Sequence, residues 1–366
     1  MGGTHLTTRE VGWLPFERLA RLGVSRPIDA APEVIVRHSL AMQAQDYAGA
    51  KWSIGLRSTS LTDTAVEEAI ASGAIVRTWP MRGTLHFLAS EDVRWMLALL
   101  APRAITAGAG RRRQLEIDAD TIARASRVLE SLLAGKPPMT RAEIFAAFED
   151  SGIAAQNQRG IHLLGWAAQS GLICQGPMRG KQATFVLLDD WIPPGPTLPR
   201  NEALARLAVR YLTSHGPATA ADLAWWAGLT LTDSRAAIAS VRSELEIATV
   251  NGADYWMTRL ETGNPYDIDT VHLLPGFDEF LLGYRDRSAV LDPANRDLVV
   301  PGGNGVFRPT FVAGGQVVGT WSRGVKKRDV SITIEWFPDI EPVDPERILP
   351  SLGLYSRFLC CRTRLA

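Results

Sequence analysis

The chain has 366 residues with 39 basic and 39 acidic side chains, so its formal net charge is zero, and 46% of its residues are hydrophobic. This length favours about two to four modules, and the neutral charge excludes a strongly basic nucleic-acid coat. The composition also excludes a membrane-spanning helix, because no apolar run approaches about 18 residues.

The N-terminal stretch MGGTHLTTREVGW lacks the charged start and apolar run of a signal peptide. The three Cys show neither metal-ligand nor disulfide spacing, and the six His do not form a metal-binding pattern. We therefore expect a cytoplasmic protein that uses no metal and no other cofactor.

The first module, residues 1–89, has helical patterns followed by two strands. Helices are predicted at about 12–22, 32–45 and 62–72, the last beginning after Thr62. The strand segments AIVRTW and GTLHFLA surround the tip Met81-Arg82-Gly83. This order of helices and hairpin is typical of a winged helix.

Two helices, at about 90–103 and 119–134, link this module to a second winged helix, so that residues 90–136 form the connection. In residues 137–192, Thr140 and Glu143 form the capping-box signature of a helix. A second helix ends at Gly171, and two short strands then turn at Met178-Arg179-Gly180.

A third winged helix is predicted in residues 193–262, after the Pro-rich segment DDWIPPGPTLPR. Three helical patterns precede a hairpin that turns at Asn251-Gly252, a strong hairpin signal. Residues 263–366 form a β-rich domain, in which Gly turns separate alternating strands and a helix at about 344–359 closes the chain.

The expected fold class is therefore α+β, with three tandem winged-helix motifs and a small C-terminal antiparallel β domain. Winged helices often bind DNA, although some only contact proteins. The tandem repetition favours an extended concave DNA-binding surface.

The stretch VRHSLAMQAQDYAGAKW places the amides of Gln43 and Gln45 at the end of an apolar segment. On a helix, residues two apart do not face each other. The two amides can therefore meet at one ligand only where the helix ends or bends, as Gly49 would allow. Alternatively, both amides cap or bridge neighbouring backbone groups.

Three segments resemble the AlkZ/YcaQ superfamily of bacterial DNA glycosylases, and the resemblance covers nearly the whole chain. They are VRHSLAMQAQDYAGAKWSIGLR, TWPMRGTLHFLASED and HLLPGFDEFLLGYRDRS. The resemblance implies that Gln43-Ala44-Gln45 is the catalytic Gln-aliphatic-Gln signature of the AlkZ-like branch. It also implies removal of N7-alkylated purines, including excision that unhooks interstrand crosslinks, and self-resistance to DNA-alkylating natural products.

Glutamine cannot serve as a general base, but a cationic N7-alkylpurine leaves as a neutral base without protonation. The enzyme then needs to hold a water molecule and stabilise an oxocarbenium-like sugar. Amide oxygens can do both. Lys51 is the only Lys near the motif, so a Schiff-base lyase step has little support and we expect a monofunctional glycosylase.

Five further residues are candidates for catalytic support. Asp46 could act as a base on the water, or could be an ordinary carboxylate at the helix C-terminus, bonded to Lys51 or an Arg. His38 could serve the site or be a satisfied core histidine. Arg82, Thr84 and His86 belong to a motif of the resemblance and support the site or contact a phosphate, unless they form a structural hairpin network.

Contacts with double-stranded DNA containing alkylated purines are expected at local basic clusters, each of which could also be ordinary solvated surface. The loop at 323–328, between two strands, is the favoured phosphate contact. The candidates are Arg111, Arg112, Arg113, Arg179, Lys181, Arg323, Lys326, Lys327 and Arg328. One active-site surface per chain predicts a monomer.

Two other functions remain open from the sequence. A winged-helix transcription regulator would require a dimer and a basic recognition helix, but the helices at about 156–170 and 231–243 are not notably basic. A non-catalytic damage-binding protein would keep the same fold, and only an activity measurement separates it from a glycosylase.

Overall fold

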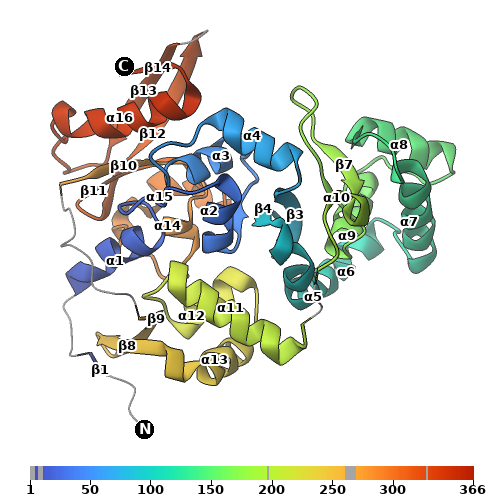
Figure 1. Ribbon diagram of the computed structural model, residues 1–366, viewed down its shortest axis with the longest axis horizontal. Coiled ribbons are helices and arrows are strands. Elements are labelled where there is room, and N and C mark those ends of the chain that lie inside the picture. The colour runs from blue at the N-terminus through green and yellow to red at the C-terminus, as the bar shows by residue number, and fades with distance from the viewer. Residues whose placement is uncertain (1–4, 7–10, 196–197, 260–268, 327–328) are drawn as a thin grey trace. The chain divides into compact units, whose positions relative to one another are not determined.

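The computed structural model describes residues 5–6, 11–195, 198–259, 269–326 and 329–366 (Figure 1). Contacts divide the chain into two units. Unit 1 comprises residues 1–66 and 204–366, and unit 2 comprises residues 67–203. Among the described residues, no helix is both long and apolar enough to cross a membrane. Helices and strands occur in both units, which agrees with the expected α+β class.

Unit 1 combines helices from the N-terminal and the C-terminal parts of the chain. Thr219 and Asp222 form a capping box at the start of α12, and Asp344 caps α16, which has Pro345 in its first turn. The α-helices are α1 (Leu14–Arg21), α2 (Pro32–Ser39), α3 (Tyr47–Gly55), α12 (Ala220–Ala227), α13 (Leu231–Ser240), α14 (Glu279–Leu282), α15 (Arg296–Val299) and α16 (Pro345–Leu359). Helices α4 (Asp63–Ala71) and α11 (Arg200–Ser214) cross the unit boundaries, and short 3-10 helices cover Val11–Trp13, Arg242–Glu244, Pro293–Asn295 and Pro301–Gly303.

Two sheets lie in unit 1. In the first, β8 (Leu245–Val250) pairs with β1 (His5–Leu6) and β9 (Ala253–Thr258). Its hairpin turns at Asn251 and Gly252, whose φ angles of 50° and 78° fit the predicted Asn-Gly turn. The second sheet has the order β10-β11-β12-β13-β14, with α16 packed against it (Figure 1). Its strands are β10 (Val271–Leu274), β11 (Thr310–Ala313), β12 (Gln316–Lys326), β13 (Asp329–Trp336) and β14 (Arg362–Leu365).

Unit 2 is built on strands in the order β4-β3-β6-β7-β5, paired antiparallel. These are β3 (Ile75–Met81), β4 (Thr84–Ala89), β5 (Met139–Thr140), β6 (Ile173–Gln175) and β7 (Thr184–Leu187). The helices are α5 (Ser90–Ala107), α6 (Ala109–Gln114), α7 (Ala119–Leu133), α8 (Arg141–Asp150), α9 (Arg159–Gln169) and α10 (Leu188–Trp191).

Local signals in the sequence explain how several elements of unit 2 begin and turn. Thr140 and Glu143 form the predicted capping box of α8. Arg82 and Gly83, with φ angles of 54° and 72°, make the tight turn between β3 and β4. Helices α7, α8 and α9 then bury a common core that includes Leu129 and Phe148.

The helix predicted over 32–45 begins where expected, at Pro32, but is too long. Helix α2 ends at Ser39, Leu40 has a φ of 66°, and α3 begins at Tyr47. Leu40, Ala41, Met42 and Ala44 are all buried, so burial there does not follow a helical period. A short apolar run of this kind is compatible with either a buried helix or a buried extended segment. The number of winged helices and the concave DNA-binding surface stay predictions.

Candidate active site

The Gln43-Ala44-Gln45 motif lies between α2 and α3, where Met42–Gln43 forms the short strand β2 and the chain bends at Gln45 and Asp46. This non-helical path brings the two amides together, and Gln43 Nε2 donates a hydrogen bond of 2.6 Å to Gln45 Oε1. Gln43 is only 8% exposed, whereas Gln45 is exposed, so the pair runs from the interior to the surface.

The hydrogen bonds of this pair determine which polar atoms remain for a ligand. The backbone N–H of Gln43 donates to Glu279 Oε1 at 3.3 Å. Within the described part of the chain, Gln43 Oε1 and Gln45 Nε2 have no protein hydrogen-bond partner. The site therefore offers one amide acceptor and one amide donor to a water molecule.

Asp46 directly follows the motif and is exposed. It was expected at a helix C-terminus, which is wrong, because it is the N-cap residue of α3. Its side chain makes no capping bond, and a Cβ added at Gly49 would lie 2.4 Å from Asp46 Oδ2. Gly49 is thus the residue that leaves room for this carboxylate beside the first turn of α3.

Two other nearby candidates have firm partners of their own. Lys51 is 6% exposed, and its Nζ forms an ion pair of 2.8 Å with Asp63 Oδ2. His38 Nε2 donates to the backbone oxygen of Arg21 at 2.7 Å. Burial lowers the pKa of His38, although this hydrogen bond acts in the opposite direction. The hydrogen bond of His38 fits the alternative of a satisfied core histidine, and a catalytic role for His38 stays a prediction.

Arg82, Thr84 and His86 form one network in the β3–β4 hairpin of unit 2. The Nδ1 of the buried His86 donates to the Thr84 backbone oxygen at 2.9 Å. Its Nε2 therefore accepts, and Arg82 Nη2 lies 3.4 Å from it. The structure brings these three predicted residues together, and their contribution to catalysis stays a prediction.

The sequence reasoning missed a group of buried polar residues in unit 1. Glu279, which accepts from Gln43, also accepts from Trp226 Nε1 at 2.8 Å and contacts His215 Nε2 at 3.3 Å. Glu279 belongs to the segment HLLPGFDEFLLGYRDRS, which carried the resemblance, but it was given no role. Asp278 and Glu279 are adjacent acids in a largely apolar stretch, and this pattern could have identified Glu279 as a candidate.

The neighbouring Asp278 forms a second buried contact, with α3. Arg57 Nη1 and Nη2 donate to Asp278 Oδ2 and Oδ1 at 2.8 and 2.9 Å, and Ser53 Oγ donates to Oδ2 at 2.6 Å. Burial acts to raise the pKa of Asp278, but Arg57 and these hydrogen bonds outweigh it and hold the pKa below its usual range. Asp278 therefore fixes α3 from one side, while Glu279 holds the strand that precedes it.

The model of the DNA glycosylase AlkZ-like family matches residues 36–351, which include the motif and both acids. The chain belongs to this family of DNA glycosylases. An interstrand DNA cross-link repair glycosylase of Streptomyces sahachiroi is 27% identical over 326 residues, or 84% of this chain and 85% of the relative. The solved structure of Streptomyces sahachiroi DNA glycosylase AlkZ has the same fold, with a TM-score of 0.80 at 23% identity over 98% of this chain and 100% of that chain.

As in any DNA glycosylase, positively charged side chains are candidates for DNA contacts. Arg111 donates to Gln114 and Gln158 at 3.0 Å, and Arg112 donates to the Ile105 backbone oxygen at 2.6 Å. Burial lowers the pKa of Arg112. Arg113 is exposed and its side chain makes no hydrogen bond to the described residues, so its charge is the most accessible of the three.

The second basic cluster is partly neutralised. Arg179 Nη1 pairs with Glu143 Oε1 at 2.7 Å, and Nη2 donates to the Pro138 backbone oxygen, while Lys181 is exposed. Because Arg179 is already paired with Glu143, we expect its contact with a phosphate to strengthen DNA binding less than a contact from Arg113.

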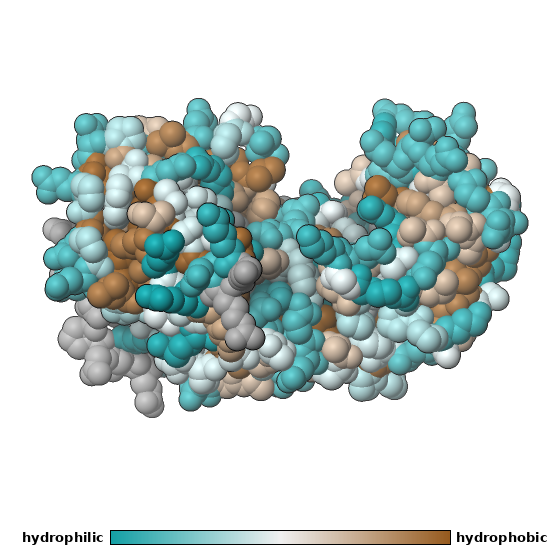
Figure 2. All heavy atoms as spheres, turned by 90° about the horizontal axis from the view of Figure 1, so that it is seen from above, coloured by the Kyte–Doolittle hydropathy of each residue, from teal (hydrophilic) through white to brown (hydrophobic). Residues whose placement is uncertain are grey.

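The expected loop at 323–328 is shorter than predicted, because β12 continues to Lys326 and pairs there with Asp329. Arg323 lies on the strand and donates to the Tyr355 hydroxyl. Lys327 and Arg328 lie outside the described residues. On the face shown in Figure 2, hydrophilic and apolar residues are interspersed.

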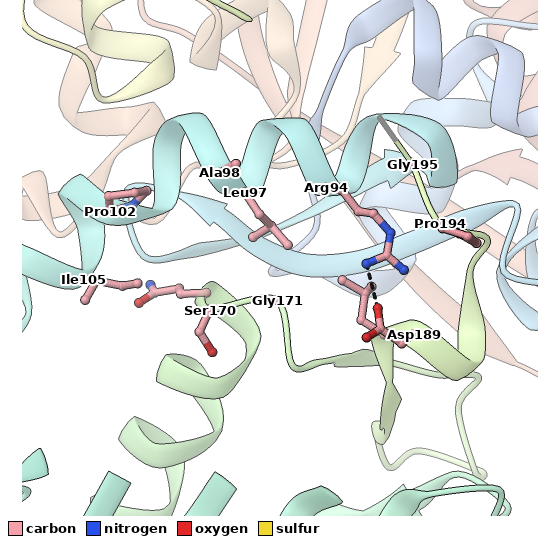
Figure 3. A pocket seen from close by; sticks show the side chains of 12 residues that line it. Arg94, Leu97, Ala98, Pro102, Ile105, Ser170, Gly171, Asp189, Pro194 and Gly195 are labelled. Atoms are coloured by element: carbon pink, nitrogen blue, oxygen red, sulfur yellow. Dashed lines mark hydrogen bonds and ion pairs between the residues drawn. The ribbon is translucent and has the colours of Figure 1, made fainter. Parts of the chain in front are cut away.

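A hollow of about 660 Å³ in unit 2 contains none of the predicted site residues (Figure 3). Leu97 and Pro102 of α5 line it together with Ser170, and Arg94 pairs with Asp189 at its edge at 2.7 Å. Its lining is mostly apolar and holds no amide or carboxylate pair comparable to the Gln43 motif.

Proposed function

We propose that this DNA glycosylase hydrolyses the N-glycosidic bond of cationic N7-alkylated purines in duplex DNA, and that Gln43 and Gln45 hold the attacking water. The observation that carries this proposal is the 2.6 Å hydrogen bond between the two amides. It holds the two side chains together and leaves Gln43 Oε1 as an acceptor. Membership of the AlkZ-like family supports the reaction class.

The charge of the leaving group explains why neutral amides suffice. An N7-alkylguanine already carries positive charge, so its bond to C1′ breaks with the electron pair moving into the purine, which leaves neutral. Water then forms the new bond to C1′ and releases a proton to solvent. Gln43 Oε1 accepts a hydrogen bond from that water and places partial negative charge near the oxocarbenium-like sugar, which is worth roughly 10²–10³ in rate per well-placed group.

The same two amides disfavour reaction with undamaged DNA. A normal purine must be protonated before it can leave, and an amide has no proton to give at cellular pH. Asp46, Arg82, Thr84, His86 and His38 support the water or the sugar-phosphate in this proposal. We further propose that the protein acts as a monomer and that its winged helices form the DNA-binding surface.

The relative's name suggests a substrate beyond simple monoadducts, because it is called an interstrand DNA cross-link repair glycosylase. In a crosslink through N7, both joined purines are cationic, so the same hydrolysis would detach one strand. We propose that this chain also unhooks such crosslinks.

A duplex containing one N7-methylguanine tests the reaction directly. After incubation with the protein, heating in alkali cleaves the strand at any abasic site. We expect cleavage with the wild-type protein and little with Gln45→Ala. If wild type cleaves neither this duplex nor one with an N7-linked crosslink, the proposal is overturned in favour of a non-catalytic damage-binding protein.

A further inference from the structure

The Glu279 carboxylate is the least exposed acid that touches the Gln43 motif, with 1% of its surface accessible. It lies at the first position of α14, immediately after the capping residue Asp278. Oε1 accepts from the Gln43 backbone N–H at 3.3 Å, and Oε2 accepts from Trp226 Nε1 at 2.8 Å. A side chain from a segment more than 200 residues away in sequence therefore holds the motif by its backbone.

Burying a carboxylate costs free energy, so the contacts of Glu279 show what keeps it in this position. A buried carboxylate is retained at a low free-energy cost only when hydrogen bonds satisfy it. Trp226 and His215, which contact Oε2, are themselves fully buried, and their rings lie 5.2 Å apart. The His215 ring also stacks on Tyr211 at 4.7 Å. Glu279 is thus held by a packed aromatic cluster and cannot shift without disturbing the core.

Further bonds lock this cluster to both ends of α14. Tyr211 donates from its hydroxyl to the Gly283 backbone oxygen at 2.7 Å, and the Tyr284 hydroxyl donates to the His215 backbone oxygen at 2.8 Å. Asp278 joins the start of α14 to Ser53 of α3 and to Arg57, which follows that helix. The Glu279 carboxylate, which accepts from the Gln43 N–H, is therefore held in place by contacts at both ends of α14.

We infer that Glu279 is the positioning residue of the catalytic motif. Its carboxylate fixes the backbone of Gln43, and thereby the direction in which the Gln43 and Gln45 amides project. This inference rests on the proposed function of Gln43. Misplacement of a catalytic group by about 1 Å can lower the rate roughly 10²-fold. The proposed role of Gln43 therefore requires that its backbone be held in place.

Hydrogen exchange tests the positioning without requiring any substrate. In Glu279→Gln, only one of the two side-chain atoms can accept, so either Gln43 or Trp226 loses its acceptor. We expect about tenfold faster amide exchange in a peptide covering residues 40–46, since one charge-assisted hydrogen bond is lost. Asp222→Asn is the matched control, because Asp222 is equally buried in unit 1 but bonds Thr219 and the Arg285 N–H instead. Unchanged exchange in both Glu279→Gln and Glu279→Asp, the second of which is one methylene too short to reach Gln43, would overturn the inference.

A double-mutant cycle tests whether Glu279 acts through Gln43. On an N7-methylguanine duplex, we expect Glu279→Gln to lower single-turnover excision about 10- to 100-fold in the wild-type background. In the Gln43→Ala background it should lower excision by less than about twofold, with DNA affinity unchanged in both. Equal losses in the two backgrounds would show that Glu279 does not work through Gln43.

The two proposals fail in different ways. If Gln43→Ala excises normally, the proposed role of Gln43 falls, while faster exchange in Glu279→Gln would still show that Glu279 holds the segment. If Glu279→Gln does not fold, Glu279→Asp takes its place, because it keeps the charge but is one methylene too short to reach Gln43. Loss of folding in both variants would assign Glu279 to the core alone and overturn the inference.

Discussion

Gln43 donates from Nε2 to Oε1 of Gln45 across 2.6 Å, and this bond gives the two amides different tasks. The Gln45 oxygen is occupied by Gln43, whereas the Gln43 oxygen is directed away from that bond. In the proposed reaction, Gln43 therefore supplies the acceptor for a water molecule, and Gln45 orients Gln43. A pair of identical side chains thus works as an ordered unit.

Replacing either glutamine by alanine should slow base excision without unfolding the protein. We expect Gln43→Ala and Gln45→Ala each to lower the single-turnover rate roughly 10²- to 10³-fold, because each removes one amide from the water or from its support. Since the two act as a unit, the double variant should be little slower than either single one. Rates on an N7-methylguanine duplex, together with thermal unfolding and DNA affinity, check this prediction.

Gln316→Ala is the control, because Gln316 is an exposed glutamine whose side chain bonds only the Ala289 backbone oxygen among the described residues. It should excise at the wild-type rate. Unfolding of both motif variants would instead support the structural alternative, in which the two amides bridge the backbone.

Local signals in the sequence predicted much of the fold. The capping box of Thr140 and Glu143 and the turn at Asn251-Gly252 depend on a few adjacent residues, so each was readable and correct. The conformation of the segment from Leu40 to Asp46 could not be predicted in this way. Every residue from Leu40 to Ala44 is buried, so no periodicity of burial distinguishes a helix from a strand. Tertiary burial there outweighs the helical pattern.

The motif itself was predictable, but its support was not. Gln43 and Gln45 stood out as two amides in an apolar segment, and the need for a bend followed from helix geometry. Glu279 contacts Gln43 across 236 positions of sequence, and nothing local to either residue indicates that they meet. The same holds for Arg57 and Asp278, which are 221 positions apart.

Arg113 and Arg179 should contribute unequally to DNA binding. Arg113 is exposed without a partner among the described residues, whereas Arg179 is paired with Glu143 at 2.7 Å. Each phosphate contact adds about 0.9 to the slope of log affinity against log salt concentration. We expect Arg113→Ala to reduce that slope by about this amount and Arg179→Ala to leave it nearly unchanged. Equal slopes for the two variants would contradict this ranking.

Breaking the buried ion pair of Arg57 and Asp278 should destabilise the protein strongly. Asp278→Asn leaves the Arg57 guanidinium buried without its charge partner, which costs about 3–5 kcal/mol. Glu335→Gln is the control, because Glu335 pairs with Arg308 at the surface and such pairs contribute about 0–1 kcal/mol. Urea unfolding at neutral pH checks the difference, and equal effects of the two variants would contradict it.

The same pair predicts how stability depends on pH. The folded state holds the pKa of Asp278 below its usual range, so the unfolded state binds the proton more readily. The contribution of Asp278 is complete above the unfolded pKa of about 3.9 and is lost as pH falls through the folded value. The stability difference between wild type and Asp278→Asn should therefore shrink in acid, and a difference that stays constant down to that range would contradict this account.

Lys51 should be dispensable for catalysis, although it is the lysine nearest to the motif in sequence. Its Nζ forms an ion pair with Asp63 at 2.8 Å and lies 5.2 Å from the Tyr47 ring, so the amine is held by these contacts rather than directed at a sugar as a nucleophile. We expect Lys51→Met to destabilise α3 but to excise at close to the wild-type rate under conditions where it is folded. Borohydride added during the reaction should trap no protein–DNA adduct, since water and not an amine attacks C1′. A trapped adduct that disappears in Lys51→Met would show a lyase mechanism and would replace the water-based reaction proposed for Gln43 and Gln45.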